Sequence, residues 1–237
     1  MAVYKMINRL LLYTLLLTGS CVADKSWAQE QSTASLPVSL FPNADTARPL
    51  IFYITGDGGW NRFSSTFVQT IRNRGYAVVA LDARTYFWHK KSATQTASDV
   101  ASLLNRYLSE WKRKHFILIG YSFGADVAPF AVTRFGNDLL AKMNDLVLMS
   151  PSAKTDFEVH VSGLLGFGNS SGESVPAEIN KISKNMLLLF GDNENDFPLN
   201  KLTTKNFKTI RLPGGHHYDG DPAAVSEAIF ASIAARH

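Results

Sequence analysis

The segment Gly120–Tyr121–Ser122–Phe123–Gly124 constrains this chain most, because it directly follows the apolar run His115–Ile119. The run has the pattern of a buried β-strand, and the residues after Gly124 have the pattern of a helix. A serine between two glycines at such a junction lies on a sharp strand-to-helix turn, where the glycines leave room for neighbouring backbone. The turn presents the Ser122 hydroxyl at the edge of a sheet.

Strand and helix patterns alternate along the rest of the chain. This alternation predicts an α/β fold of one domain over residues 37–237, with a mostly parallel central sheet and helices on both faces. The expected strands are Leu50–Ile54, Ala77–Leu81, His115–Ile119, Leu146–Met149, Met186–Phe190 and Thr209–Leu212. The expected helices are Asn61–Arg74, Thr94–Trp111, Ala125–Phe135 and Pro222–Ala235.

The first 28 residues have the order of a secretory signal peptide. Lys5 and Arg9 precede an apolar stretch at 10–17, which is shorter than the about 20 residues that span a bilayer. Ser26–Trp27–Ala28 offers a cleavage site, so we expect export to the periplasm, with a linker over residues 29–36. Cys21, the single cysteine, leaves a lipoprotein anchor as an alternative, and an uncleaved N-terminal anchor is another.

The charge balance argues against a nucleic-acid partner. The formal charge is +4 at pH 7, and removal of the leader lowers it to about +2. No basic stripe with interleaved aromatic residues is present in the sequence, although peripheral contact with an anionic membrane is compatible with this charge. The sequence also lacks nucleotide fingerprints and cysteine ligands for a metal, so we expect no cofactor.

A serine hydroxyl becomes a strong nucleophile only when a base removes its proton, and a third group must orient that base. In α/β-hydrolases the acid and the histidine follow the serine in that order, and the histidine lies after the last strand. That loop contains His216 and His217. The preceding Gly215 favours His216 as the base, with His217 as the alternative.

The acid is expected in the segment after the strand Met186–Phe190. Three carboxylates are available there: Asp192, Glu194 and Asp196. Asp196 is followed by an apolar residue and a proline, as expected where the loop turns back towards the serine. We therefore predict Asp196 as the acid and keep Glu194 and Asp192 as alternatives.

Two backbone amides are needed to hold the negative charge that develops on a carbonyl oxygen during attack. The amide of Phe123, next to the serine, is one expected donor. The other is the amide of Asp57, in the glycine-rich loop Thr55–Trp60 that follows the first predicted strand. A second glycine-rich stretch, Phe157–Ser174, is where hydrolases of this fold often insert a cap, and we expect a short cap loop there.

Several motifs extend beyond this constellation and share an order with a known family. They are Gly56–Trp60, Tyr86–Trp88, Gln95–Asp99, Gly120–Val127, Ser150–Ser152 and Leu212–Asp221. On these motifs the chain resembles the VirJ/AcvB family of bacterial virulence proteins, in its short single-domain form. The resemblance covers nearly all of the chain after residue 36.

The resemblance implies a periplasmic α/β-hydrolase, with Ser122, Asp196 and His216 on matching motif positions. Some members of the family cleave the aminoacyl ester of lysyl-phosphatidylglycerol, and others are linked to type IV secretion. We therefore expect a serine hydrolase that cleaves an ester on a membrane lipid, with substrate contacts from Gly58, Trp60, Asp126 and His217. Two alternatives remain: a non-enzymatic periplasmic partner of a type IV secretion system, and a general small-ester or thioester hydrolase.

Overall fold

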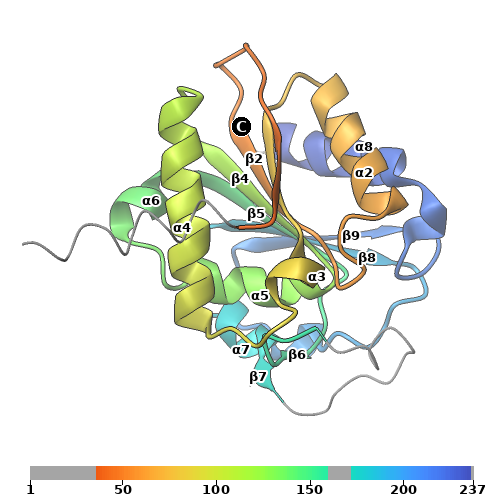
Figure 1. Ribbon diagram of the computed structural model, residues 1–237. Coiled ribbons are helices and arrows are strands. Elements are labelled where there is room, and N and C mark those ends of the chain that lie inside the picture. The colour runs from red at the N-terminus through yellow and green to blue at the C-terminus, as the bar shows by residue number, and fades with distance from the viewer. Residues whose placement is uncertain (1–35, 160–171, 236–237) are drawn as a thin grey trace, which may run out of the picture. The chain divides into compact units, whose positions relative to one another are not determined.

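The computed structural model describes residues 36–159 and 172–235, and in this part of the chain helices lie on both sides of a seven-stranded sheet (Figure 1). The strand order is β1–β3–β2–β4–β5–β8–β9. The strands are β1 Val38–Phe41, β2 Leu50–Ile54, β3 Val78–Leu81, β4 Phe116–Tyr121, β5 Met143–Met149, β8 Asn185–Gly191 and β9 Phe207–Leu212. Only β1 runs antiparallel to its neighbour, so the sheet is mostly parallel, as predicted.

All predicted strands and helices are present, and their ends differ from the predicted ones by at most three residues. The main helices are α2 Arg62–Asn73, α4 Ala93–Glu110, α5 Phe123–Val132 and α8 Pro222–Ala234. The structure adds short elements that the sequence pattern did not predict. They are the edge strand β1, the helices α3 Ala83–Tyr86, α6 Asn137–Lys142 and α7 Val175–Ile179, and the strand pair β6 Lys154–Thr155 and β7 Glu173–Ser174.

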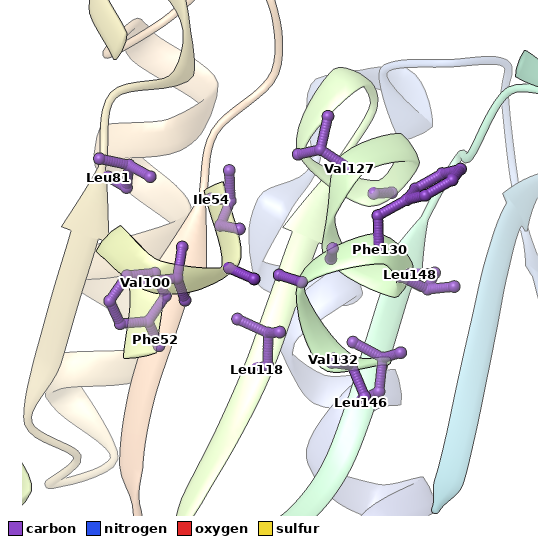
Figure 2. Packing of buried hydrophobic residues seen from close by; sticks show 14 of the residues in the cluster. Phe52, Ile54, Leu81, Val100, Leu118, Val127, Phe130, Val132, Leu146 and Leu148 are labelled. Atoms are coloured by element: carbon purple, nitrogen blue, oxygen red, sulfur yellow. The ribbon is translucent and has the colours of Figure 1, made fainter. Parts of the chain in front are cut away.

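Alternate residues of the central strands face opposite sides of the sheet, and both sides are buried. On one side, Phe52 and Leu118 pack beneath α4 and α5, which contribute Val100 and Phe130 (Figure 2). On the other side, α2 and α8 cover a second cluster and lie next to each other (Figure 1). Successive side chains of a central strand therefore enter two different cores. Because both cores are apolar, every position of the strand is apolar, and the strand appears in the sequence as a continuous apolar run.

The carboxyl ends of parallel strands meet at one edge of a sheet, and ligands of open α/β sheets bind at that edge. Here β2, β4, β5, β8 and β9 all end there, so the loops that follow them converge. These loops carry the glycine-rich segment, Ser122, Ser150, Glu194 and His216. The fold therefore brings together residues that are almost 100 positions apart in the chain, such as Ser122 and His216.

The described residues, 36–159 and 172–235, belong to one compact unit. The predicted signal peptide and all but the last residue of the predicted linker lie outside the described residues, as do positions 160–171 of the predicted cap loop. The described end of that loop, Phe157, is buried between Phe87 and Phe130. None of the helices in the described ranges has the length and apolar character needed to cross a bilayer.

Candidate active site

The backbone at Ser122 has the strained geometry that the motif predicts. Ser122 lies between β4 and α5 with φ 52° and ψ −120°, in the region that side-chain-bearing residues rarely adopt. A Cβ atom at Gly120 would lie 2.7 Å from the Cα atom of Ala125. A Cβ atom at Gly124 would collide with the carbonyl oxygen of Ile54 at the end of β2. Both flanking glycines are therefore required by the close approach of backbone to backbone.

His216 contacts the serine. Its Nε2 atom lies 2.8 Å from Oγ of Ser122, and its Nδ1 atom lies 2.8 Å from Oε1 of Glu194. An ionised carboxylate can only accept a hydrogen bond, so Nδ1 carries the proton and Nε2 is free to accept the serine proton. The structure thus places His216, the preferred base, in the geometry of a base.

His217, the alternative base, points elsewhere. Its Nδ1 atom lies 2.7 Å from the hydroxyl of Tyr121, which also donates to the backbone carbonyl of His216 at 3.1 Å. The two imidazole rings are inclined at 75° to each other. Tyr121 therefore holds the loop that carries His216 through contacts with both histidines. The Nδ1 atom of His217 is engaged by Tyr121 and not by the Ser122 hydroxyl.

The structure places Glu194, and not the predicted acid Asp196, against His216. The amide of Glu194 donates to the carbonyl of Gly191 at 3.0 Å, so the chain reverses immediately after β8. This tight turn brings position 194 over the sheet edge, while the side chains of Asp192 and Asp196 are exposed. The apolar residue after Asp196, Phe197, does not turn the loop towards the serine, because it is buried against Phe190 with ring centroids 5.5 Å apart.

The Glu194 carboxylate is held on both oxygens. Oε1 accepts from His216, and Oε2 accepts from the Ser150 hydroxyl and from the Gly191 amide, each at 2.7 Å. Burial by itself raises the pKa of Glu194, but hydrogen bonds from His216, Gly191 and Ser150 outweigh it and leave that pKa below its usual value. The Glu194 carboxylate is therefore ionised at neutral pH.

The pKa of His216 moves in the opposite direction. Burial lowers it, but the hydrogen bond and charge of Glu194, with the charges of Asp126 and Asp57, raise it to a net value above the ordinary 6.5. Three carboxylates therefore stabilise a positive charge on the imidazole. Such a charge forms when a base takes the proton of a serine during attack.

The glycine-rich loop passes directly beside the serine. A Cβ atom at Gly56 would lie 3.2 Å from Cβ of Ser122, and the Gly59 amide closes a turn by donating to the Gly56 carbonyl at 3.0 Å. Within residues 36–159 and 172–235, the amides of Asp57 and Phe123 donate to no protein acceptor. Neither predicted donor for a carbonyl oxygen is therefore engaged by the described protein, and Gly56, which precedes Asp57, lies against the serine.

The remaining predicted contact residues have distinct surroundings. Asp126 is buried one helical turn after Ser122, and its carboxylate accepts from the Ser152 amide at 2.5 Å. Burial raises the pKa of Asp126 to about 7, against hydrogen bonds from Ser152 and the charge of His216, which lower it. Trp60 is 37% exposed and stacks on Phe41 of the edge strand, with ring centroids 5.8 Å apart. Gly58 is partly exposed in the same loop.

Ser150 and Tyr218 lie in this site, although sequence reasoning noticed them only as parts of family motifs. Ser150 follows β5 and Tyr218 follows His217, so both are in loops at the carboxyl edge of the sheet. The sequence signal that could have identified them is their position, directly after a predicted strand for Ser150 and beside the predicted base for Tyr218. The carboxyl ends of parallel strands meet at one edge of the sheet, so a polar residue that follows such a strand lies near the site even when it is far from Ser122 along the chain.

Several solved structures have a similar fold. Est1E from Butyrivibrio proteoclasticus, with ferulic acid bound, is 17% identical with a TM-score of 0.59, and the match covers 82% of this chain and 92% of that one. MenH from S. aureus is 15% identical with a TM-score of 0.60, covering 82% and 96%. The Pyrococcus furiosus esterase Pf2001 is 13% identical with a TM-score of 0.59, covering 92% and 95%. At these identities the likeness shows a shared fold, the α/β-hydrolase fold.

The family is shown by a comparison of sequence. A search of curated proteins finds no match. A family model described as "Bacterial virulence protein (VirJ)" matches residues 49–237, which include the whole of the site described above. The chain is therefore a member of the VirJ family of bacterial virulence proteins, built on an α/β-hydrolase fold.

Proposed function

We propose that this protein is a serine ester hydrolase with the triad Ser122, His216 and Glu194. The observation that carries the proposal is the position of His216, which lies 2.8 Å from the Ser122 hydroxyl on one side and 2.8 Å from the Glu194 carboxylate on the other. A nucleophile, a base and an orienting acid in that order are the requirements for acyl transfer through serine. The likeness in fold to esterases supports the same class of reaction.

In the proposed mechanism, Oγ of Ser122 attacks the ester carbonyl carbon as its proton moves to Nε2 of His216. The amides of Phe123 and Asp57 hold the negative carbonyl oxygen. The intermediate collapses, the alcohol leaves with the proton from His216, and the acyl group stays on Ser122. A water molecule, deprotonated by His216, then releases the acid and restores the serine. Glu194 remains ionised throughout and stabilises the imidazolium.

The proposed substrate is an ester on a membrane lipid, with an aminoacyl-phosphatidylglycerol such as the lysyl form as the specific case. Support comes from membership of the VirJ family and from the electrostatics of the site. Glu194, Asp126 and Asp57 all act on His216 as negative charges. Because opposite charges attract, this environment favours an acyl group that carries an ammonium. The N-terminal signal-peptide pattern supports the matching location, the periplasm, where such a lipid is exposed at the membrane surface.

Labelling with a fluorophosphonate probe tests the triad directly, since the probe reacts with activated serines. We expect labelling of the wild-type protein and its loss in Ser122→Ala and His216→Ala. Absence of labelling in a folded wild-type protein would reject the enzymatic role and favour a binding role with secretion components. In that case Ser122→Ala would keep the biological phenotype.

The substrate is tested on vesicles of phosphatidylglycerol that contain lysyl-phosphatidylglycerol. We expect release of free lysine by the wild-type protein and none by Ser122→Ala. Probe labelling without lysine release, together with turnover of soluble esters or thioesters, would contradict the lipid substrate and favour a small ester or thioester. The proposed triad would then still stand.

A further inference from the structure

Ser150 is held in a strained conformation at the end of β5. It has φ 50°, in the left-handed region, and it is only 1% exposed. Its amide donates to the carbonyl of Leu189 in the adjacent strand β8 at 2.8 Å. For a residue other than glycine, such a backbone conformation costs on the order of 1–3 kcal/mol. It persists only where the surrounding structure enforces it, which is common at functional sites.

The strained backbone directs the Ser150 hydroxyl at the acid. Its Oγ atom lies 2.7 Å from Oε2 of Glu194 and 2.7 Å from the Tyr218 hydroxyl. Because an ionised carboxylate cannot donate, Ser150 must donate to Glu194, and its oxygen must accept from Tyr218. The Tyr218 hydroxyl has one proton, which it shares between Oγ of Ser150 and, at the longer distance of 3.2 Å, the carbonyl oxygen of Leu189. The hydrogen bonds therefore run in one direction, from Tyr218 through Ser150 to Glu194.

Tyr218 anchors this chain from the loop that carries the base. It lies two positions after His216, is 2% exposed and itself has φ 50°. Its ring stacks on Phe63 of α2 with centroids 6.3 Å apart. The acid and the base are thus tied together twice, directly between Glu194 and His216 and indirectly through Ser150 and Tyr218.

We propose that Ser150 and Tyr218 are positioning residues for the triad acid, a role that rests on the function proposed above. A glutamate has one more rotatable bond than an aspartate, so its carboxylate needs a second point of attachment to stay against an imidazole. Ser150 supplies that attachment on Oε2, and Tyr218 orients Ser150. Together they keep Glu194 ionised and directed at Nδ1 of His216.

The test is Ser150→Ala, read through kinetics on a soluble ester. We expect kcat/KM to fall about 10- to 100-fold, which is the range for loss of one hydrogen bond to a charged group, mainly through kcat. We also expect the low-pH limb of kcat/KM to move to lower pH, because a poorly held Glu194 raises the pKa of His216 less. Tyr218→Phe should change both quantities in the same direction and by less.

Two variants separate the hydroxyl from its surroundings. Ser150→Gly also lacks the hydroxyl but tolerates a positive φ, so it should be as impaired as Ser150→Ala. Recovery of activity in Ser150→Gly would assign the effect to backbone strain and overturn the proposal. Ser226 is a matched control, because it is fully buried in α8 and its hydroxyl has no hydrogen-bond partner in the described part of the chain. Ser226→Ala should keep wild-type kinetics.

An NMR titration of His216 supplies a readout that does not need turnover. In Ser150→Ala the pKa of His216 should fall towards its ordinary value, and an unchanged pKa would overturn the positioning role even if catalysis were lost. Failure of the proposed function is a different result, namely a folded wild-type protein that the fluorophosphonate probe does not label. If Ser150→Ala does not fold, Tyr218→Phe and Ser150→Gly carry the same comparison.

Discussion

The carboxylate of Glu194 lies against His216, with Oε1 and Nδ1 2.8 Å apart, although Asp196 stands only two residues further along an exposed stretch. A turn that closes between Gly191 and Glu194 decides which acid faces inward. The pair is partly shielded from water, with side-chain exposures of 41% for His216 and 19% for Glu194. Glu194 and Asp196 are close in sequence but differ in whether they contact His216, so variants of the two can be compared directly.

Glu194→Gln is expected to lower kcat by about 10²- to 10⁴-fold, because the amide no longer stabilises the imidazolium and can favour the wrong tautomer of His216. Asp196→Asn is the matched control, since it neutralises an exposed carboxylate nearby, and it should keep wild-type kcat. Steady-state kinetics on a soluble ester measures both. Equal losses in the two variants would contradict the assignment of the acid.

The pH dependence of activity follows from the raised pKa of His216. A protonated imidazole cannot accept the serine proton, and a raised pKa keeps it protonated up to a higher pH. The low-pH limb of kcat/KM should therefore lie above 6.5, the ordinary pKa of histidine. In Glu194→Gln the limb should move to lower pH, because the charge of Glu194 and its charged hydrogen bond, which contribute most to the rise in the pKa of His216, are removed. A limb that stays in place would show that another group titrates.

Gly124→Ala should destabilise the protein strongly. The added Cβ atom would meet the carbonyl oxygens of both Ile54 and Thr55, and backbone at the end of a central strand cannot easily move. We expect a loss of about 1–3 kcal/mol or more in the free energy of unfolding, typical of overpacking. Gly136→Ala is the control, because nothing lies within 4 Å of the added atom, and it should change that free energy by less than about 1 kcal/mol.

Asp126→Asn should stabilise the folded protein at neutral pH. Burial raises the pKa of Asp126 from 3.8 to about 7, so between those pH values the folded state holds a proton that the unfolded state has released. Stability from this group is therefore present at low pH and is lost as pH rises through that window. Asparagine keeps an acceptor for the Ser152 amide without the charge. Urea denaturation at pH 5 and pH 8 should show the larger gain at pH 8, on the order of a few kcal/mol at most, and a smaller gain at pH 5, which lies inside that window.

Asp126→Asn also tests substrate charge. If the carboxylates of the site attract an ammonium, KM for a lysyl ester should rise in this variant, while KM for a neutral acyl ester of equal size should not. Asp138→Asn, on the exposed start of α6, removes the same charge away from the site and should leave both values unchanged. A parallel rise for both esters would remove the electrostatic support for a cationic acyl group.

Much of the fold could be predicted from the sequence. Strands buried on both faces appear as short apolar runs, and in the helices between them apolar residues recur with a period of about 3.6 residues. The edge strand Val38–Phe41 was not recognised. It has only four residues, and its burial is partial, so it lacks the continuous apolar character of the central strands. The short helices α3, α6 and α7 escaped for the same reason, since four to six residues are too few to show a period.

In the site, Ser122 and His216 were predictable because glycines next to them mark tight backbone turns. The carboxylate that contacts His216 was not predictable. The glycines around Ser122 reveal the elbow, because only glycine permits that approach of backbone, and Gly215 pointed to His216. For the acid, the sequence offered three carboxylates, Asp192, Glu194 and Asp196, and no local pattern showed which of them the turn after β8 directs inward.

By itself, the sequence indicated the candidate nucleophile, the candidate base and the succession along the chain of the strands that carry them, since local backbone geometry and hydrophobic periodicity depend on neighbouring residues. Only the tertiary structure places Glu194 against His216, Ser150 against Glu194 and Tyr218 against Ser150. Those contacts join the loops after β5, β8 and β9 across 22 to 68 residues of chain. The direction of a side chain in such a loop depends on the turn beneath it and on partners from other strands, which exist as neighbours only after the sheet has formed.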